Sequence, residues 1–168
     1  MTEKTLSLKE LLTLANKGDS DAQYDLGWMY ESGEGVKKDL KEAFKWFSLA
    51  AKQGDAGAQF NLGWMYESGE GVAKNPKEAL KFYELAANQG DPDAQYSLGL
   101  MLANGDGCPQ DLVAAYMWFT LADIAEVDEA IDVRDEIEEE MSDAQIVKAE
   151  MMTKEWIMKN GSDEDGIE

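Results

Sequence analysis

The chain repeats one phrase at a fixed spacing of 36 residues. Residues 24–36 read YDLGWMYESGEGV, and residues 60–72 read FNLGWMYESGEGV. Self-similarity at this period is typical of a solenoid, because each unit is too small to bury its apolar face without a stacked neighbour. The spacing continues into a third unit, as two sets of residues show: Gly27, Gly63 and Gly99, and Trp46, Phe82 and Trp118. The sequence therefore predicts three consecutive units, at about residues 19–54, 55–90 and 91–126.

Each unit contains the signals of two helices, and the first helix has a clear start and end. Asp91 is an N-cap residue followed by Pro92 at the first helical position, and Asp19 holds the equivalent place in the first unit. This first helix is expected at about residues 20–32. Gly33 is expected to end it, because glycine adopts the left-handed conformation without strain.

The second helix of each unit begins with the spacing of a capping box. Asp39 and Glu42 are three residues apart, and Asn75 and Glu78 repeat this arrangement with a proline between them. The helix is expected to end at the next glycine, Gly54 in the first unit. Each unit is therefore a helical hairpin with a glycine-bearing turn, and the fold class is all-α.

Two flanking segments complete the predicted domain. Residues 1–18 look like a lone second helix, and residues 127–160 are expected to form a helical cap that covers the last hairpin. The apolar residues expected to seal that hairpin are Ile131, Ile137, Ile146, Val147, Trp156 and Ile157. Residues 1–160 would then form one domain, and residues 161–168 an acidic, disordered tail.

The pattern of the first unit resembles a known family, the Sel1-like repeat, which is related to the tetratricopeptide repeat but has a longer turn. The residues that carry the resemblance are Ala22, Leu26, Gly27, Tyr30, the turn Gly33–Val36, Asp39, Ala43, Trp46, Ala50, Ala51 and Gly54. The resemblance implies a right-handed α/α solenoid that acts as a scaffold or adaptor, and the C-terminal segment is similar to that of bacterial members.

Composition excludes several other functions. The formal net charge of −20 argues against binding to nucleic acid or to anionic membranes, which are bound by an excess of Lys and Arg. The chain has no histidine, so nucleophilic triads and His-containing zinc sites are not expected. We expect a non-enzymatic protein with no cofactor, no metal and no inserted membrane segment. The lack of a basic, then apolar, N-terminal signal predicts a cytoplasmic location.

Two local features have simple structural explanations. The G-x-G pairs, such as Gly33 and Gly35, lack the further glycine or the Gly-Lys-Ser/Thr of a phosphate loop, so they are read as turns. Cys108 stands where Val36 and Val72 stand in the other units. It is therefore expected to be a small buried apolar residue.

A second apolar stripe on the first helices is the candidate binding site. At 100° per residue, Ala22, Leu26 and Tyr30 share the face that packs on the second helix. The opposite face carries the candidate partner-binding residues Tyr24, Trp28, Phe60, Trp64, Tyr96 and Leu100. This stripe could line a concave groove with an acidic border of Asp21, Glu31, Glu67 and Asp93. The alternative is that neighbouring first helices bury the stripe as part of the stacking core.

The predicted function is binding of a protein or peptide segment with aliphatic and basic residues. A second possibility is an acidic decoy or chaperone-like protein, whose negative surface engages basic partners without a specific groove. Acidic residues are concentrated towards the end of the chain, since residues 127–168 hold 15 Asp and Glu against four Lys and Arg.

Overall fold

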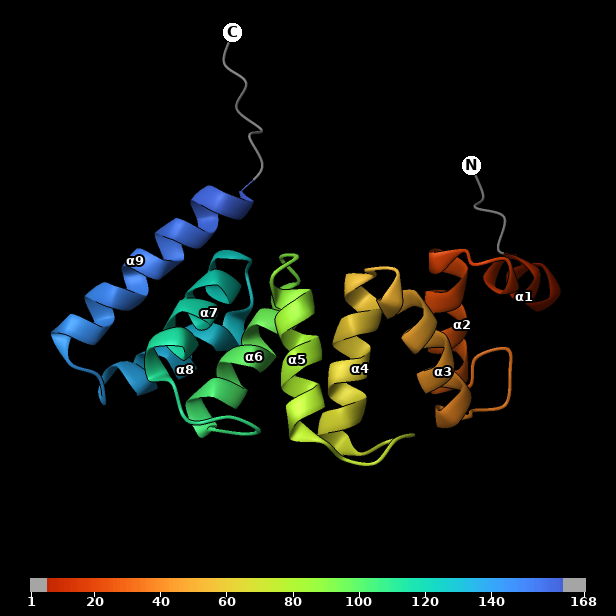
Figure 1. Cartoon of the computed structure of the whole chain (residues 1–168), viewed down its shortest axis with the longest axis horizontal. Coiled ribbons are helices and arrows are strands. Elements are labelled where there is room, and N and C mark those ends of the chain that lie inside the picture. The colour runs from red at the N-terminus through yellow and green to blue at the C-terminus, as the bar shows by residue number, and fades with distance from the viewer. Residues whose placement is uncertain (1–5, 162–168) are drawn as a thin grey trace, which may run out of the picture. The chain divides into compact units, whose positions relative to one another are not determined.

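The computed structural model describes residues 6–161, and within them the fold is entirely helical (Figure 1). The described helices are α1 (Leu8–Asn16), α2 (Ser20–Ser32), α3 (Leu40–Lys52), α4 (Ala56–Ser68), α5 (Pro76–Ala87), α6 (Pro92–Asn104), α7 (Leu112–Ile124), α8 (Asp128–Glu138) and α9 (Asp143–Asn160). They form two compact units that divide between Ala86 and Ala87, here called unit 1 and unit 2. The all-α prediction is confirmed.

Capping determines where the first helix of each repeat begins and ends. The Asp19 carboxylate accepts a hydrogen bond from the Ala22 N–H at 2.9 Å, and Asp55 does the same for Ala58 at 2.7 Å. At the other end, Gly33 has a φ of 81° and Gly69 a φ of 83°, which are left-handed conformations that suit glycine. The sequence therefore predicted the ends of α2 and α4 correctly, because caps are local signals.

The recurring mid-helix glycines allow the two helices of each hairpin to approach closely. A Cβ added to Gly27 would lie 2.5 Å from the Phe47 ring, and one added to Gly63 would lie 2.5 Å from the Tyr83 ring. Both rings are at most 1% exposed. The second helix thus packs an aromatic ring directly on the glycine.

Unit 1 is a stack of hairpins with α1 added at its start, as Figure 1 shows. α1 contributes Leu11 and Ala15 to a cluster with Leu26 and Trp46 of the first hairpin. The helix begins at Leu8, because Ser7 and Glu10 form a capping box. Residues 1–5 of the predicted N-terminal helix lie outside the described residues.

Buried glutamines connect each hairpin of unit 1 to the helix before it. The Gln23 side-chain amide donates to the Ala15 carbonyl at 3.0 Å, and Gln59 donates to the Ala51 carbonyl at 3.3 Å. Both glutamines are about 95% buried or more. A polar side chain is stable here because it satisfies a carbonyl at the end of the preceding helix.

Unit 2 contains the third hairpin, α6 and α7, together with the capping helices α8 and α9. Its core contains Phe119 of α7, Ile137 and Met141 from the α8 segment, and Ala149 of α9. Trp156 of α9 contacts the Trp118 ring edge to face, with centroids 6.1 Å apart. Both α8 and α9 contact α7 of the third hairpin, and a cap over residues 127–160 stays a prediction.

Only part of the predicted seal is buried. Ile137 is buried, and Ile146 and Trp156 are half-buried. The prediction is wrong for three residues, because they lie on outward faces of α8 and α9: Ile131, Val147 and Ile157, which are 41%, 54% and 40% exposed.

Two further expectations concern Cys108 and the tail. Cys108 is only half-buried, so it is less enclosed than predicted, because it lies in the open turn between α6 and α7. Burial and the nearby Asp106 raise the pKa of its thiol, which keeps it protonated at neutral pH. Residues 162–168 of the predicted tail lie outside the described residues. A single domain over residues 1–160 stays a prediction.

Candidate functional site

The structure separates the six candidate residues into two groups by exposure. Trp28 on α2 and Trp64 on α4 are open to solvent, at 45% and 37% exposed. The other four are half-buried: Tyr24, Phe60, Tyr96 and Leu100. The half-buried group fits the stacking-core explanation, and a binding groove lined by the exposed group stays a prediction.

The half-buried aromatic residues of unit 1 join the stacking core. The Tyr24 ring lies 5.8 Å from the Phe47 ring and also covers Gly57 at the start of α4. The Phe60 ring lies 5.7 Å from the Tyr83 ring. Because these rings link neighbouring helices, their removal would affect stability before it affected binding.

In unit 2, Tyr96 and Leu100 are likewise engaged in packing. The Tyr96 ring lies 5.9 Å from the Phe119 ring, and Leu100 packs against the same core cluster. In the third repeat, Leu100 is the equivalent of Trp28 and Trp64, but it is smaller and less exposed. Among the six candidates, the exposed aromatic surface is thus Trp28 and Trp64, which we call the tryptophan pair.

The tryptophan pair lies on adjoining helices of unit 1. α2 and α4 contact each other, and the two residues hold equivalent places in consecutive repeats. Packed helices are about 8–10 Å apart, so the indoles are expected at roughly that spacing.

Carboxylates flank Trp28 of the tryptophan pair on both sides along α2. On α2, Asp25 follows Tyr24, and Glu31 is three residues beyond Trp28, so both flank the indole. Partial desolvation raises the pKa of the Asp25 carboxyl, and the like charges of Asp21 and Asp19 raise it further. Burial also raises the pKa of Glu31, although Lys38 opposes this. Negative charge is therefore concentrated here, and a cation would relieve it.

Two tyrosines of unit 1 have polar neighbours on an adjoining helix. Burial raises the pKa of the Tyr24 phenol, and the nearby Asn61 side chain of α4 partly offsets this rise. The Tyr83 hydroxyl donates to the Glu67 carboxylate at 2.7 Å. Glu67, predicted as part of the acidic border, thus has a structural contact as well as a surface position.

Sequence reasoning missed Asp25 and Asn61 as members of this surface. Each lies three residues before the tryptophan of its own helix, so the two hold equivalent places in consecutive repeats. Residues three apart are neighbours on a helix surface, so this spacing could have identified them. The remaining predicted border residue of unit 1, Asp21, is exposed beside them.

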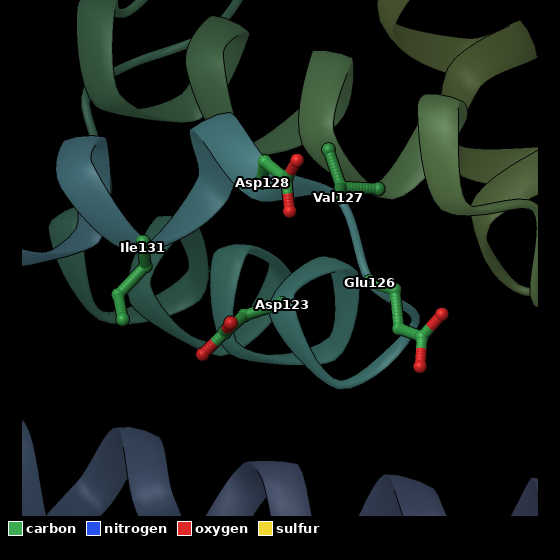
Figure 2. Close-up of a pocket in the computed structure, with 5 residues that line it drawn as sticks. All are labelled: Asp123, Glu126, Val127, Asp128 and Ile131. Carbon is green, nitrogen blue, oxygen red and sulfur yellow. The ribbon is translucent and has the colours of Figure 1, made fainter.

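A separate, acidic hollow lies in unit 2, where α7 meets α8 (Figure 2). It is lined by Asp123, Glu126, Val127, Asp128 and Ile131. Its Asp123 carboxylate already accepts a hydrogen bond from Arg134 at 2.8 Å. Within residues 6–161, no cluster of three His, Cys, Asp or Glu side chains is arranged to hold a metal ion. No helix in the same residues is long and apolar enough to cross a membrane.

These features define a helical-repeat protein with an exposed aromatic pair on one face. The sequence profile described as "Sel1 repeat" matches residues 20–55, 56–91 and 92–122, which is more than half of the chain. The chain therefore belongs to the Sel1 repeat family. No curated protein sequence matches it.

Solved structures show the same fold. A Sel1 repeat protein from Oxalobacter formigenes is 36% identical with a TM-score of 0.71, and the match covers 77% of this chain and 97% of that one. The protein c5321, a protective antigen of uropathogenic Escherichia coli strains displaying an SLR fold, is 29% identical with a TM-score of 0.69. That match covers 91% of this chain and 41% of c5321. Sel1 repeats generally act as protein-interaction scaffolds without catalytic activity.

Proposed function

We propose that this protein is a non-enzymatic adaptor that binds a segment of another protein on the face carrying the tryptophan pair. The observation that supports this most is the exposure of two large aromatic side chains at equivalent places on contacting helices. Neighbouring exposed apolar side chains mark interaction sites, whereas scattered single ones do not, and truncation of a tryptophan at an interface centre commonly costs about 2 kcal/mol or more.

The spacing of the tryptophan pair suggests the shape of the segment. A polyproline II strand advances about 3.1 Å per residue with three residues per turn, so residues i and i+3 face the same side about 9 Å apart. This matches the roughly 8–10 Å between packed helices. Two side chains of the partner could therefore cover Trp28 and Trp64 at the same time.

The surrounding carboxylates suggest the composition of the segment. Lys and Arg place an apolar stem on an indole and a cation near carboxylates, and a cation over an indole face contributes about 0.5–2 kcal/mol. Burial raises the pKa of both Asp25 and Glu31, and the like charges of Asp21 and Asp19 add to this at Asp25, so a bound cation would stabilise their ionised forms. We propose a partner segment with aliphatic and basic residues, bound in the cytoplasm of a bacterial cell.

The experiment compares capture by four forms of the full chain: wild type, Trp28→Ala, Trp64→Ala and the double variant. Each is confirmed as folded by circular dichroism, immobilised, and exposed to the native cell extract, and bound proteins are identified by mass spectrometry. The matched control is Ile124→Ala, which removes a 61% exposed apolar side chain elsewhere. A partner retained by wild type and the control but lost by the double variant supports the proposal. Equal capture by all forms refutes it.

The alternative is an acidic decoy that engages basic partners through charge alone, which the net charge of −20 favours. Salt separates the two functions, because surface charges are screened over about 10 Å at 0.1 M salt. A decoy should lose its partner steeply as salt rises and should be insensitive to the tryptophan substitutions. We further propose that residues 1–160 act as one domain, which a single calorimetric unfolding transition would support and two resolved transitions would contradict.

A further inference from the structure

Helix α9 of unit 2 has two apolar faces, and only one of them is used within the unit. The inner face carries Ala149 and Thr153, which are buried, and Trp156, which packs on Trp118. At 100° per residue, Val147 and Met151 lie about 180° from this face. They are 54% and 56% exposed, and Figure 1 shows α9 at the edge of its unit.

The outer face follows the spacing of a coiled-coil seam. Its residues alternate three and four apart along α9: Ala144, Val147, Met151, Lys154 and Met158. This is the a and d pattern of a heptad repeat, which buries apolar side chains against a second helix. Every residue of this set is exposed, and Met158 is 84% exposed. We call this set the outer seam.

We propose that the outer seam binds the outer seam of a second copy of this chain, with the two α9 helices antiparallel. In this arrangement Met151 packs beside Lys154 of the second copy, and Val147 packs beside Met158 of the second copy. The flanking charges then match, because Lys148 faces Glu155 of the second copy. Two-fold symmetry repeats every one of these contacts, as an isologous interface requires.

Charge excludes the parallel alternative. A parallel pair would place Lys154 directly against Lys154 of the second copy in the centre of the seam. It would also place Glu150 near Glu155 of the second copy, which are like charges. In the antiparallel pair, the Lys154 stem instead covers a methionine while its amine reaches solvent.

The local charge also makes α9 a better surface for self-association than the acidic remainder of unit 2. The helix carries three acidic residues and three lysines, so its outer face is nearly neutral although the chain has a net charge of −20. Two copies can therefore approach through α9 with the least repulsion. Since two heptads bury less than the 1,200–2,000 Å² of a standard interface, we expect a weak dimer with a Kd on the order of 100 µM.

The test is sedimentation equilibrium of the full chain between about 10 µM and 1 mM in 0.15 M salt. Met151→Lys should weaken self-association at least about tenfold, because it places a second charge in the seam. Lys148→Glu should also weaken it, and Lys148→Glu combined with Glu155→Lys should restore it, since the double variant reverses both pairs and keeps the net charge.

Two control variants separate the seam from general effects. Lys159→Glu makes the same change of charge as Lys148→Glu, but Lys159 is at a b position of the heptad, which does not flank the seam. Ile124→Lys changes an exposed apolar residue of α7. Both should leave the dimer within about twofold of wild type. A wild-type chain that stays monomeric at 1 mM overturns the proposal, as does a dimer that Met151→Lys does not affect or that the double charge reversal does not restore.

Discussion

The close contact between Gly63 and Tyr83 leads to a prediction in which two effects oppose each other. Alanine is favoured over glycine inside a helix by about 1 kcal/mol. However, the new Cβ would lie 2.5 Å from Cδ1 and 2.6 Å from Cε1 of the Tyr83 ring. Ordinary carbon contacts are about 3.5–4.0 Å, so the ring would have to move by roughly 1 Å.

The Tyr83 ring has little freedom to move. It is 1% exposed, it packs on Phe60, and its hydroxyl is bonded to Glu67 at 2.7 Å. Overpacking of this kind costs about 1–3 kcal/mol. We therefore expect Gly63→Ala to lower the free energy of unfolding by about 1 kcal/mol net, and Gly63→Leu to lower it more. For a chain of this size, 1 kcal/mol corresponds to a fall in Tm of about 2–4 °C.

The assay is urea unfolding followed by circular dichroism, with a double-mutant cycle as the control. In a Tyr83→Ala background the steric conflict is gone, so Gly63→Ala should now stabilise the protein by about 1 kcal/mol. This reversal of sign distinguishes a packing effect from a backbone effect. If Gly63→Ala stabilised the chain with Tyr83 present, the close-packing explanation of the recurring glycines would be wrong.

Three further predictions concern charge and the C-terminal cap. Desolvation and like charges raise the pKa of Asp25, so its ionised form destabilises the fold at pH 7. Asp25→Asn should therefore raise Tm at pH 7, and this gain should vanish below about pH 4, where the carboxyl is protonated in the folded and the unfolded chain. The control Glu34→Gln, in the exposed turn, should leave Tm unchanged. Arg134 donates to Asp123 and Asp135 at 2.8 and 3.0 Å, so Arg134→Gln should lower the free energy of unfolding by about 1–3 kcal/mol; an unchanged urea midpoint would contradict this. Truncation after residue 126 removes Ile137, Met141 and Ala149 from the core around Phe119, so light scattering should detect aggregation, while removal of residues 162–168 should leave melting unchanged.

Local signals allowed the sequence to predict the helices with good accuracy. Asp19 marks the start of α2 and Gly33 its end, because an N-cap carboxylate and a left-handed glycine act within one turn of the helix. Ser142 and Gln145, three residues apart in the sequence, likewise form a capping box at the start of α9, where the Ser142 N–H donates to the Gln145 side chain at 3.0 Å.

The division of the aromatic stripe could not be predicted from the sequence. Tyr24 and Trp28 are only about 40° apart on a helix, so helical periodicity places them on the same face. Tyr24 is half-buried because the ring covers Gly57 of the next repeat, and Trp28 remains open. That difference depends on how neighbouring helices stack, which is a tertiary property.

Sequence reasoning also could not distinguish the two apolar faces of α9. Val147 and Trp156 both look like sealing residues in a list of apolar positions. Only Trp156 meets a partner within the unit, at the ring of Trp118. Which face turns inward depends on how α9 packs against α7, which is a tertiary property.

The central claim, that the tryptophan pair is the binding site, is tested most directly by calorimetric titration of the captured partner segment into wild type and the folded Trp28→Ala/Trp64→Ala variant. The account predicts that the Kd rises by at least about 30-fold in the variant, the equivalent of 2 kcal/mol, at both 0.05 and 0.5 M salt. A variant that binds with wild-type affinity, with salt alone weakening the complex, would contradict the account and favour the acidic decoy.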